Sequence, residues 1–549
     1  MKSSENRDER AEVGFQGSEF KRSRVRSWIV PGVVALLLMP ALLFCGRMAS
    51  TLWPGLHYDS VLYSTVVVNK SLGESFRFDA YTPALLNRPG GDMGDHGLLS
   101  YVIYGAAMND GTYGAYFRAS SAITFFSVCL MALLLFLQTR SFGWWAVLVP
   151  AAGGWLLLAV LVQIHGRPEH LIPLVVILCE LAVRLGKLGV SSAGLLRGVC
   201  CGLVAAISPA PAVLYATGLA MYYFAVFSWA ELLKVGALAA AASALTWSGL
   251  TVFLFGNSPW AAFAGAAGSD IDYRARSLAH HQWFFNANTP WIGLLYGQTL
   301  ALLVASALRR VVHDKWPLLA GAAGLLLLGA LLLAVDMTGV KNPFVNYRSI
   351  PFVPLWLLFL CAVVLVGQPP APSTQKWWLV LNRAAFAIFL LLTTLGGARF
   401  LWERYREAGA EASAFAETKA AYDALKAKLG PNERIGMDQF GSASDIVLDG
   451  PPWSMLSFVF DSPEFVESLE EAEEKLGVRI VYLVRSPRFM PVPRQEIGPF
   501  VLTGQTFPEG APAPKTYGLY IYERVDTRGP RGEGTKGQPE VGDRETDEQ

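Results

Sequence analysis

Residues 143–164 read GWWAVLVPAAGGWLLLAVLVQI, and no charged side chain interrupts them. A helix of roughly 20 apolar residues crosses the hydrocarbon core of a bilayer. In that core every backbone N–H and C=O must be paired within the chain, and a run of Leu, Ala and Val this long lacks the alternation of a barrel strand. The segment is therefore predicted to be a transmembrane helix.

The same pattern recurs along the chain. Residues 119–137, 235–256 and 317–335 also contain no charged side chain. Of the 549 residues, 53% are hydrophobic and 16% are charged, which is too apolar for an ordinary soluble domain of this length. The net charge of +1 gives no electrostatic case for nucleic acid or for an acidic partner. We expect a polytopic α-helical membrane protein.

Lys and Arg near the ends of the apolar runs set the expected topology, because cytoplasmic loops are enriched in these residues. The basic stretch 21–26 and residues such as Arg140, Lys234 and Lys376 fall in alternate connections, which we assign to the cytoplasm. This predicts about 11 transmembrane helices in the cell (inner) membrane, with the N-terminus cytoplasmic and the C-terminus outside. The expected spans are about 28–46, 118–138, 143–164, 170–186, 196–208, 211–229, 235–256, 291–308, 316–335, 351–367 and 377–398.

The stretch 196–229 has two interpretations. Its centre reads AISPAPA, and the two prolines either separate a tight pair of short helices or kink one helix. One helix fewer would invert every later loop.

Two shorter features are also predicted. Residues 98–107, LLSYVIYGAA, are apolar but too short to span, so we expect a helix lying against the membrane surface. Glu180 and Arg184 are four residues apart, which predicts an ion pair on one helix.

The composition changes near residue 403. Residues 403–430 predict a polar amphipathic helix ending at Gly430. Five segments follow that are predicted as one strand, one helix and three further strands: 433–438, 464–477, 479–485, 499–507 and 517–525. This succession predicts a small extracytoplasmic α/β domain. The expected domains are a disordered cytoplasmic N-terminus (1–27), a membrane domain (28–400), this α/β domain (401–526) and a disordered tail (527–549).

Asp59 follows the first span, in HYDSVLY, on the expected outer face. A carboxylate there could act as a general base on an acceptor hydroxyl. The alternative is a helix N-cap, a position where Asp is favoured.

Arg167 and Glu169 stand in HGRPEHL at the expected outer end of the fourth span. Glu169 could bind a divalent cation or orient an acceptor. The alternative is a charge pair with Arg167 or His170 at a helix start, where Pro168 fits the first turn.

Arg348 and Lys341 lie beside Tyr347 in VKNPFVNYRSIPFVPLW, outside a late apolar run. The charge rule disfavours cations on the outer face, so we interpret both as binding an anion. An arginine fork suits two phosphate oxygens and would stabilise charge on a leaving oxygen. Neutralisation by Asp270, Asp272 or Asp336, or by lipid headgroups, is the competing interpretation.

Four stretches occur in an informative order: Asp59 in the first outer loop, HGLLSYVIYGA (96–106), GRPEHLIPLVVILCELA (166–182) and NYRSIPFVPLWLLFL (346–360). This order resembles the polytopic C-superfamily (GT-C fold) glycosyltransferases, which include the protein mannosyltransferases and the aminoarabinose lipid A transferases. Members take a sugar from a polyprenyl-phosphate donor at the extracytoplasmic face.

The resemblance implies a GT-C-like membrane domain with Asp59 as the catalytic base and Glu169 near the same cavity. It also implies that Arg348 and Lys341 approach the donor phosphate. Tyr347, Arg167 and His96 complete the expected substrate-binding set.

Many members show two consecutive acidic residues, whereas Ser60 follows Asp59 here, which leaves metal dependence and activity open. No cofactor is assigned beyond a possible divalent cation, and the acceptor is a lipid, glycan or protein. The alternatives are a lipid or solute transporter and a non-catalytic scaffold of surface-polymer assembly.

Overall fold

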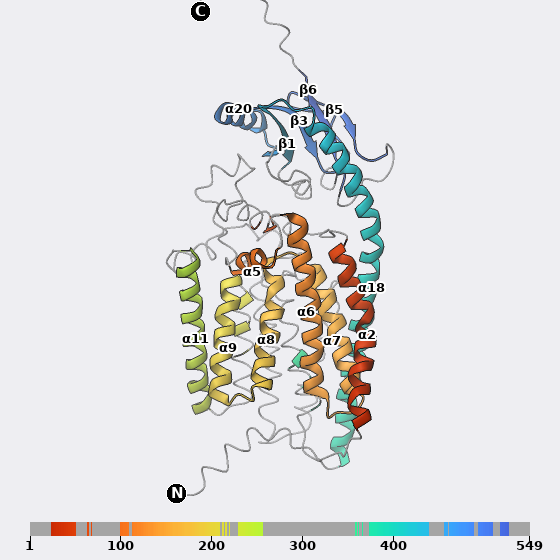
Figure 1. Cartoon of the computed structure of the whole chain (residues 1–549), viewed down its shortest axis with the longest axis vertical. Coiled ribbons are helices and arrows are strands. Elements are labelled where there is room, and N and C mark those ends of the chain that lie inside the picture. The colour runs from red at the N-terminus through yellow and green to blue at the C-terminus, as the bar shows by residue number, and fades with distance from the viewer. Residues whose placement is uncertain are drawn as a thin grey trace, which may run out of the picture.

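A computed structural model gives the fold of the chain (Figure 1). It describes residues 24–50, 63–64, 67, 99–108, 112–208, 211–212, 215–216, 219, 229–255, 357–358, 361, 365, 373–438, 455–458, 460–487, 492–508 and 517–525.

The membrane part is a bundle of helices whose long axes are roughly aligned (Figure 1). Its main members are α2 (Arg24–Ser50), α6 (Tyr113–Thr139), α7 (Trp145–Gln163), α8 (Ile172–Leu185), α9 (Val190–Ile207) and α11 (Trp229–Phe255). Within the described ranges, five helices are long and apolar enough to cross a membrane: α2, α6, α7, α9 and α11. They lie where spans were predicted. The predicted total of about 11 helices stays a prediction, because several expected spans fall outside the described residues.

Helix α7, predicted from residues 143–164, packs against α2, α6 and α18 and is the most buried of the five candidate spans in the described part of the chain. Its double glycine lets two neighbours approach closely. A Cβ on Gly153 would lie 2.2 Å from Cδ1 of Leu135 in α6, and one on Gly154 would lie 2.7 Å from Cδ2 of Leu38 in α2. Protein interiors are close-packed, so a larger residue at either position would force Leu135 or Leu38 to move.

Helices α9 and α11 run parallel to each other. Gly194 of α9 lies against Val235 of α11, and Gly202 lies against Thr246. The contacts therefore advance along both helices in the same direction. Small residues spaced in this way allow two helix backbones to touch. Both helices therefore begin at the same end of the bundle. Most of residues 208–228 lie outside the described part of the chain, so the two interpretations of 196–229 stay predictions.

The predicted pair of Glu180 with Arg184 is wrong. Glu180 instead accepts two hydrogen bonds from Arg197 of α9, at 2.7 and 2.8 Å, and Arg184 donates to Gln138 of α6. The fork of an arginine on a facing helix matches both carboxylate oxygens, which a neighbour on the same helix does less well.

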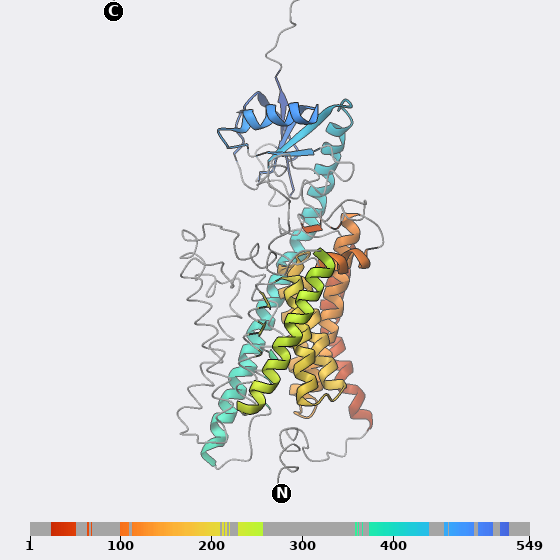
Figure 2. The same cartoon turned by 90° about the vertical axis from the view of Figure 1, so that its left-hand side faces the viewer.

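A single long helix joins the bundle to the soluble domain. Helix α18 (Ser373–Lys426) packs against α7 and then continues beyond the bundle (Figures 1 and 2). The predicted span 377–398 and the predicted polar helix 403–430 are therefore parts of one element. The domain limit expected between residues 400 and 401 falls inside it.

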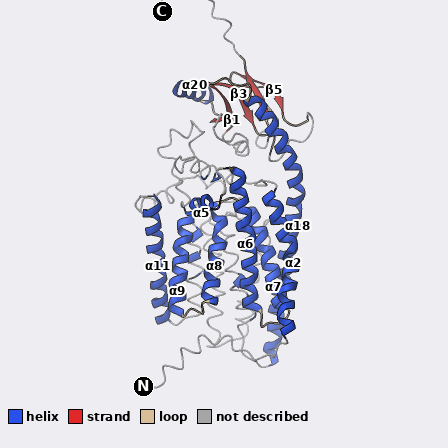
Figure 3. Ribbon diagram, in the orientation of Figure 1, coloured by secondary structure: helices blue, strands red, loops and turns tan. Residues whose placement is uncertain are grey.

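The soluble domain contains one six-stranded sheet (Figure 3). The strand order is β2-β1-β3-β6-β5-β4, in which β2, β1 and β3 are parallel and the remaining pairs are antiparallel. Ile435 of β1 pairs with Met455 of β2 and Tyr482 of β3. The elements are β1 (Glu433–Asp438), β2 (Met455–Phe458), α20 (Phe465–Leu476), β3 (Arg479–Arg485), β4 (Glu496–Ile497), β5 (Phe500–Gln505) and β6 (Tyr520–Arg524).

Two helices cover this sheet. Helix α20 buries Phe465 and Leu469 against one face, and the last turns of α18 bury Tyr422 and Leu425 in the core of the other. Gly477, in the left-handed region at φ 61°, ends α20. The β-α-β-β-β segments predicted from the sequence are confirmed, and β2 and β4 are additional.

The short helix α5 (Leu99–Ala107) confirms the non-spanning helix predicted at 98–107. It packs on α6, α9 and the turn after α7, at the end of the bundle that faces the sheet domain (Figure 1). Helix α2 begins at the opposite end (Figures 1 and 2).

Candidate functional site

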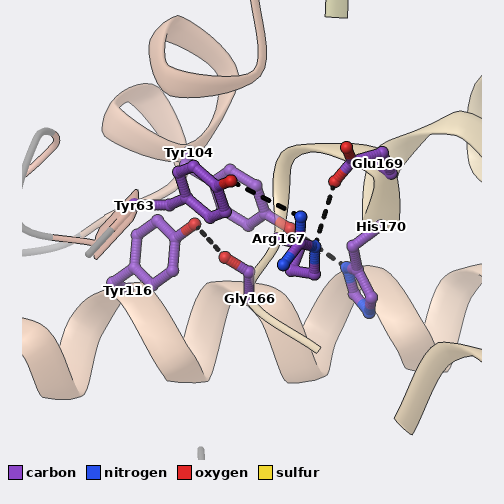
Figure 4. Close-up of polar contacts among 7 residues, drawn as sticks. All are labelled: Tyr63, Tyr104, Tyr116, Gly166, Arg167, Glu169 and His170. Atoms are coloured by element: carbon purple, nitrogen blue, oxygen red, sulfur yellow. Dashed lines mark hydrogen bonds and ion pairs between the residues drawn. The ribbon is translucent and has the colours of Figure 1, made fainter. Parts of the chain in front are cut away.

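The candidate site is the turn between α7 and α8, underneath α5 (Figure 4). Gly166 has a φ of 77°, which allows the chain to reverse direction after α7. Pro168 then begins the 3₁₀ helix η2 (Pro168–Leu171), as expected for a residue that lacks a backbone donor. The sequence HGRPEHL thus brings four polar side chains to the end of an apolar bundle.

Arg167 and Glu169 form a buried ion pair. The Arg167 Nε lies 3.3 Å from Glu169 Oε2, and each side chain is 1% exposed. Arg167 Nη2 also lies 3.4 Å from the hydroxyl of Tyr63, and the guanidinium is 5.1 Å from the centre of that ring. The charge pair offered as one alternative for Glu169 is therefore present, while cation binding by Glu169 stays a prediction.

His170 is held by two hydroxyl groups. Its Nδ1 is 3.0 Å from the hydroxyl of Tyr104, and its Nε2 is 2.8 Å from Oγ1 of Thr124. Thr124 donates its only hydroxyl proton to the Ser120 carbonyl, at 3.1 Å. Thr124 must therefore accept from an Nε2–H. Burial lowers the pKa of His170 well below its usual range, so Nδ1 carries no proton and accepts from Tyr104. His170 is neutral, with its proton on Nε2.

The same hydrogen-bond argument applies to the ring of His165. Ser121 donates to the Phe117 carbonyl at 3.0 Å and so accepts from Nε2 of His165, at 3.3 Å. The ring of His165 stacks on Phe117, and Tyr116 donates to the Gly166 carbonyl at 2.6 Å. With both histidines neutral, the charges of Arg167 and Glu169 cancel within the cluster.

We expect this histidine pair to make the protein acid-sensitive. Burial lowers the pKa of His165 to about 3 and lowers that of His170 well below its usual range. An unfolded chain takes up protons near pH 6.5 while the folded chain does not, so stability falls as pH drops from about 6.5 toward 3. Melting temperatures across this range should fall less steeply in a His165→Gln/His170→Gln variant. An unchanged slope would contradict this account.

The site lies at an end of the bundle that also carries an exposed aromatic pair on α18. Two contacts show that α7 and α18 run in the same direction. Trp145 near the start of α7 stacks on Phe386 of α18, and Ala159, later in α7, lies against Gly397, later in α18. Tyr405 lies on α18 beyond that second contact, and Arg167 lies in the turn beyond the end of α7, so both belong to the same end of the bundle. Trp402 and Tyr405 are stacked and are 62% and 45% exposed. Exposed Trp and Tyr mark the headgroup layer of a bilayer.

The other predicted site residues lie outside the described residues. These are Asp59, His96, Lys341, Tyr347 and Arg348, and their roles stay predictions. Within the described part of the chain, no group of three or more His, Cys, Asp or Glu side chains could hold a metal ion. The possible divalent cation likewise stays a prediction.

Several residues of the site were not predicted: Tyr63, Tyr101, Tyr104, Tyr116, Thr124 and His165. A signal was present, because Tyr101 and Tyr104 are three residues apart in a short helix and so lie on one face. Their partners are distant in sequence, which spacing alone cannot identify.

Comparisons with known proteins give one distant likeness. No protein-family model matches the chain, and no curated protein matches it. The crystal structure of the Archaeoglobus fulgidus oligosaccharyltransferase, in complex with zinc and sulfate, aligns with 82% of this chain and 68% of its own. The identity is 14% and the TM-score is 0.42, and a likeness at this level assigns no family.

Proposed function

We propose that this chain is a membrane glycosyltransferase of the cell membrane that transfers a sugar from a polyprenyl-phosphate donor to an extracytoplasmic lipid, glycan or protein. The observation that carries the proposal is the buried Arg167–Glu169 pair at the same end of the bundle as the sheet domain. Ionisable side chains inside a membrane bundle are costly, and they usually mark a functional site.

The donor's chemistry fits this position. An isoprenoid tail stays in the bilayer, so the phosphate and sugar attached to it lie at the headgroup layer. An enzyme for such a donor needs polar groups at that depth, beside apolar helix faces. Leu36, Leu245 and Phe253 leave apolar surface on α2 and α11 at 68%, 74% and 83% exposure.

Covalent geometry supports Asp59 as the general base. Tyr63 contacts Arg167, and Asp59 precedes Tyr63 by four residues. Four residues span at most about 14 Å, a separation compatible with Asp59 acting in the same site as the Arg167–Glu169 pair. In the proposal Asp59 takes the acceptor proton, Glu169 assists the acceptor, and Arg348 and Lys341 hold the leaving phosphate.

The test is a transfer assay on the protein in lipid nanodiscs. We expect transfer from a polyprenyl-phosphate sugar and none from the matching nucleotide sugar. A variant with Arg348→Gln and Lys341→Gln should lose about 10-fold or more in kcat/KM, because hydrogen bonds to a charged group are lost.

Lys419→Gln on α18 is the matched control, because Lys419 is exposed and pairs only with Asp423 among the described residues. Donor movement across vesicles without a new glycosidic bond would instead support a transporter. Donor binding without turnover would support a scaffold.

A further inference from the structure

Four tyrosines belong to the candidate site: Tyr63, Tyr101, Tyr104 and Tyr116. Among them, only Tyr101 makes no hydrogen bond with the described residues. It lies on α5, three residues before Tyr104, and its side chain is 1% exposed. Its hydroxyl has no hydrogen-bond partner in the part of the chain that the structure describes. By contrast, Tyr104 bonds to His170 and Tyr116 to Gly166.

A buried hydroxyl without a partner is rare, because removing it from water is costly. Tyr101 lies in the candidate site, since Glu169 and Arg167 are close enough to act on its hydroxyl electrostatically. Burial is the main cause that raises the pKa of Tyr101 well above its usual range, and Tyr63 is the next. The hydroxyl therefore keeps its proton at neutral pH and can donate it.

The charge of the cluster selects the kind of ligand. Arg167 and Glu169 cancel, and both histidines are neutral, so the described part of the site has no net charge to attract an anion. A phosphate here would also face the Glu169 carboxylate. A neutral group rich in hydroxyls suits the cluster better, since it can donate to a carboxylate and accept from a phenol.

We propose that the Tyr101 hydroxyl binds a ring or hydroxyl oxygen of the sugar, so that this cluster holds the sugar and not the phosphate of the donor. The inference rests on the proposed function and deepens it. Because Tyr101 is buried in this structure, the groups that cover it must move before a sugar can reach its hydroxyl.

The test begins with stability, without ligand. Tyr101→Phe removes only the unpaired oxygen, so we expect the melting temperature to rise. Tyr104→Phe and Tyr116→Phe each break an existing hydrogen bond and should lower it. A fall for Tyr101→Phe as large as that for Tyr104→Phe would show that the hydroxyl is already satisfied, and would overturn the inference.

The second measurement is binding in nanodiscs of a polyprenyl-phosphate hexose and of the same polyprenyl phosphate without sugar. We expect the wild-type protein to prefer the hexose form. Tyr101→Phe should weaken binding of that form about tenfold and leave the bare phosphate unchanged, as expected for one lost hydrogen bond.

If both lipids bind and Tyr101→Phe keeps the full preference, this inference fails while the proposed function stands. If neither lipid binds the wild-type protein, the proposed function fails, and this inference with it.

Discussion

We expect Asp59→Asn to slow sugar transfer severely while the protein stays folded. The amide of Asn has the size of the carboxylate but cannot take up a proton, so it removes the base and little else. General-base catalysis typically contributes about 10²- to 10⁴-fold, and we expect a loss of that order in kcat. Initial rates in nanodiscs measure the loss, and the melting temperature reports whether the fold is kept.

The same substitution separates the two interpretations of Asp59. Asn is as good an N-cap as Asp, so a capping role predicts no change in either activity or stability. Asp423→Asn on α18 is the matched control: Asp423 is exposed and pairs with Lys419 at 2.9 Å, and such surface pairs contribute about 0–1 kcal/mol. Full activity in Asp59→Asn would reject the catalytic assignment.

Arg167→Met destabilises the fold by about 3–5 kcal/mol, the usual cost of removing one partner of a buried ion pair. The reason is the desolvation of Glu169, whose carboxylate loses the guanidinium that lies 3.3 Å away. Equilibrium unfolding in mixed micelles, followed by circular dichroism, gives the free energy. Comparison with Glu403→Gln, which removes an exposed pair with Arg399, sets the baseline.

A double-mutant cycle tests the cause. Arg167→Met/Glu169→Gln removes both charges, so it should lose clearly less stability than the sum of the two single variants. Additive losses would mean that the two side chains act separately, and the ion pair would then not explain the destabilisation.

The long helix α18 illustrates why the limits of elements were harder to predict than their type. The sequence pattern ended a span near residue 398, next to Gly396 and Gly397, and began a new helix at 403. Glycine weakens a helix, but Gly397 is used for close packing, since a Cβ there would lie 3.3 Å from Ala159 of α7. The tertiary contact therefore outweighs the local preference. Strands β2 and β4, with four and two residues, were missed because their pairing partners define them.

Properties of short segments were determined by the sequence alone: apolar length predicted the helices of the bundle, and Gly166 and Pro168 fit the turn after α7. The succession of segments after residue 430 likewise predicted β1, β3, β5 and β6. The tertiary structure alone decided that Glu180 pairs with Arg197 and that His170 lies between Tyr104 and Thr124. These contacts depend on how helices far apart in the sequence are rotated and aligned against each other. Packing of the whole bundle sets that alignment, and no single segment encodes it.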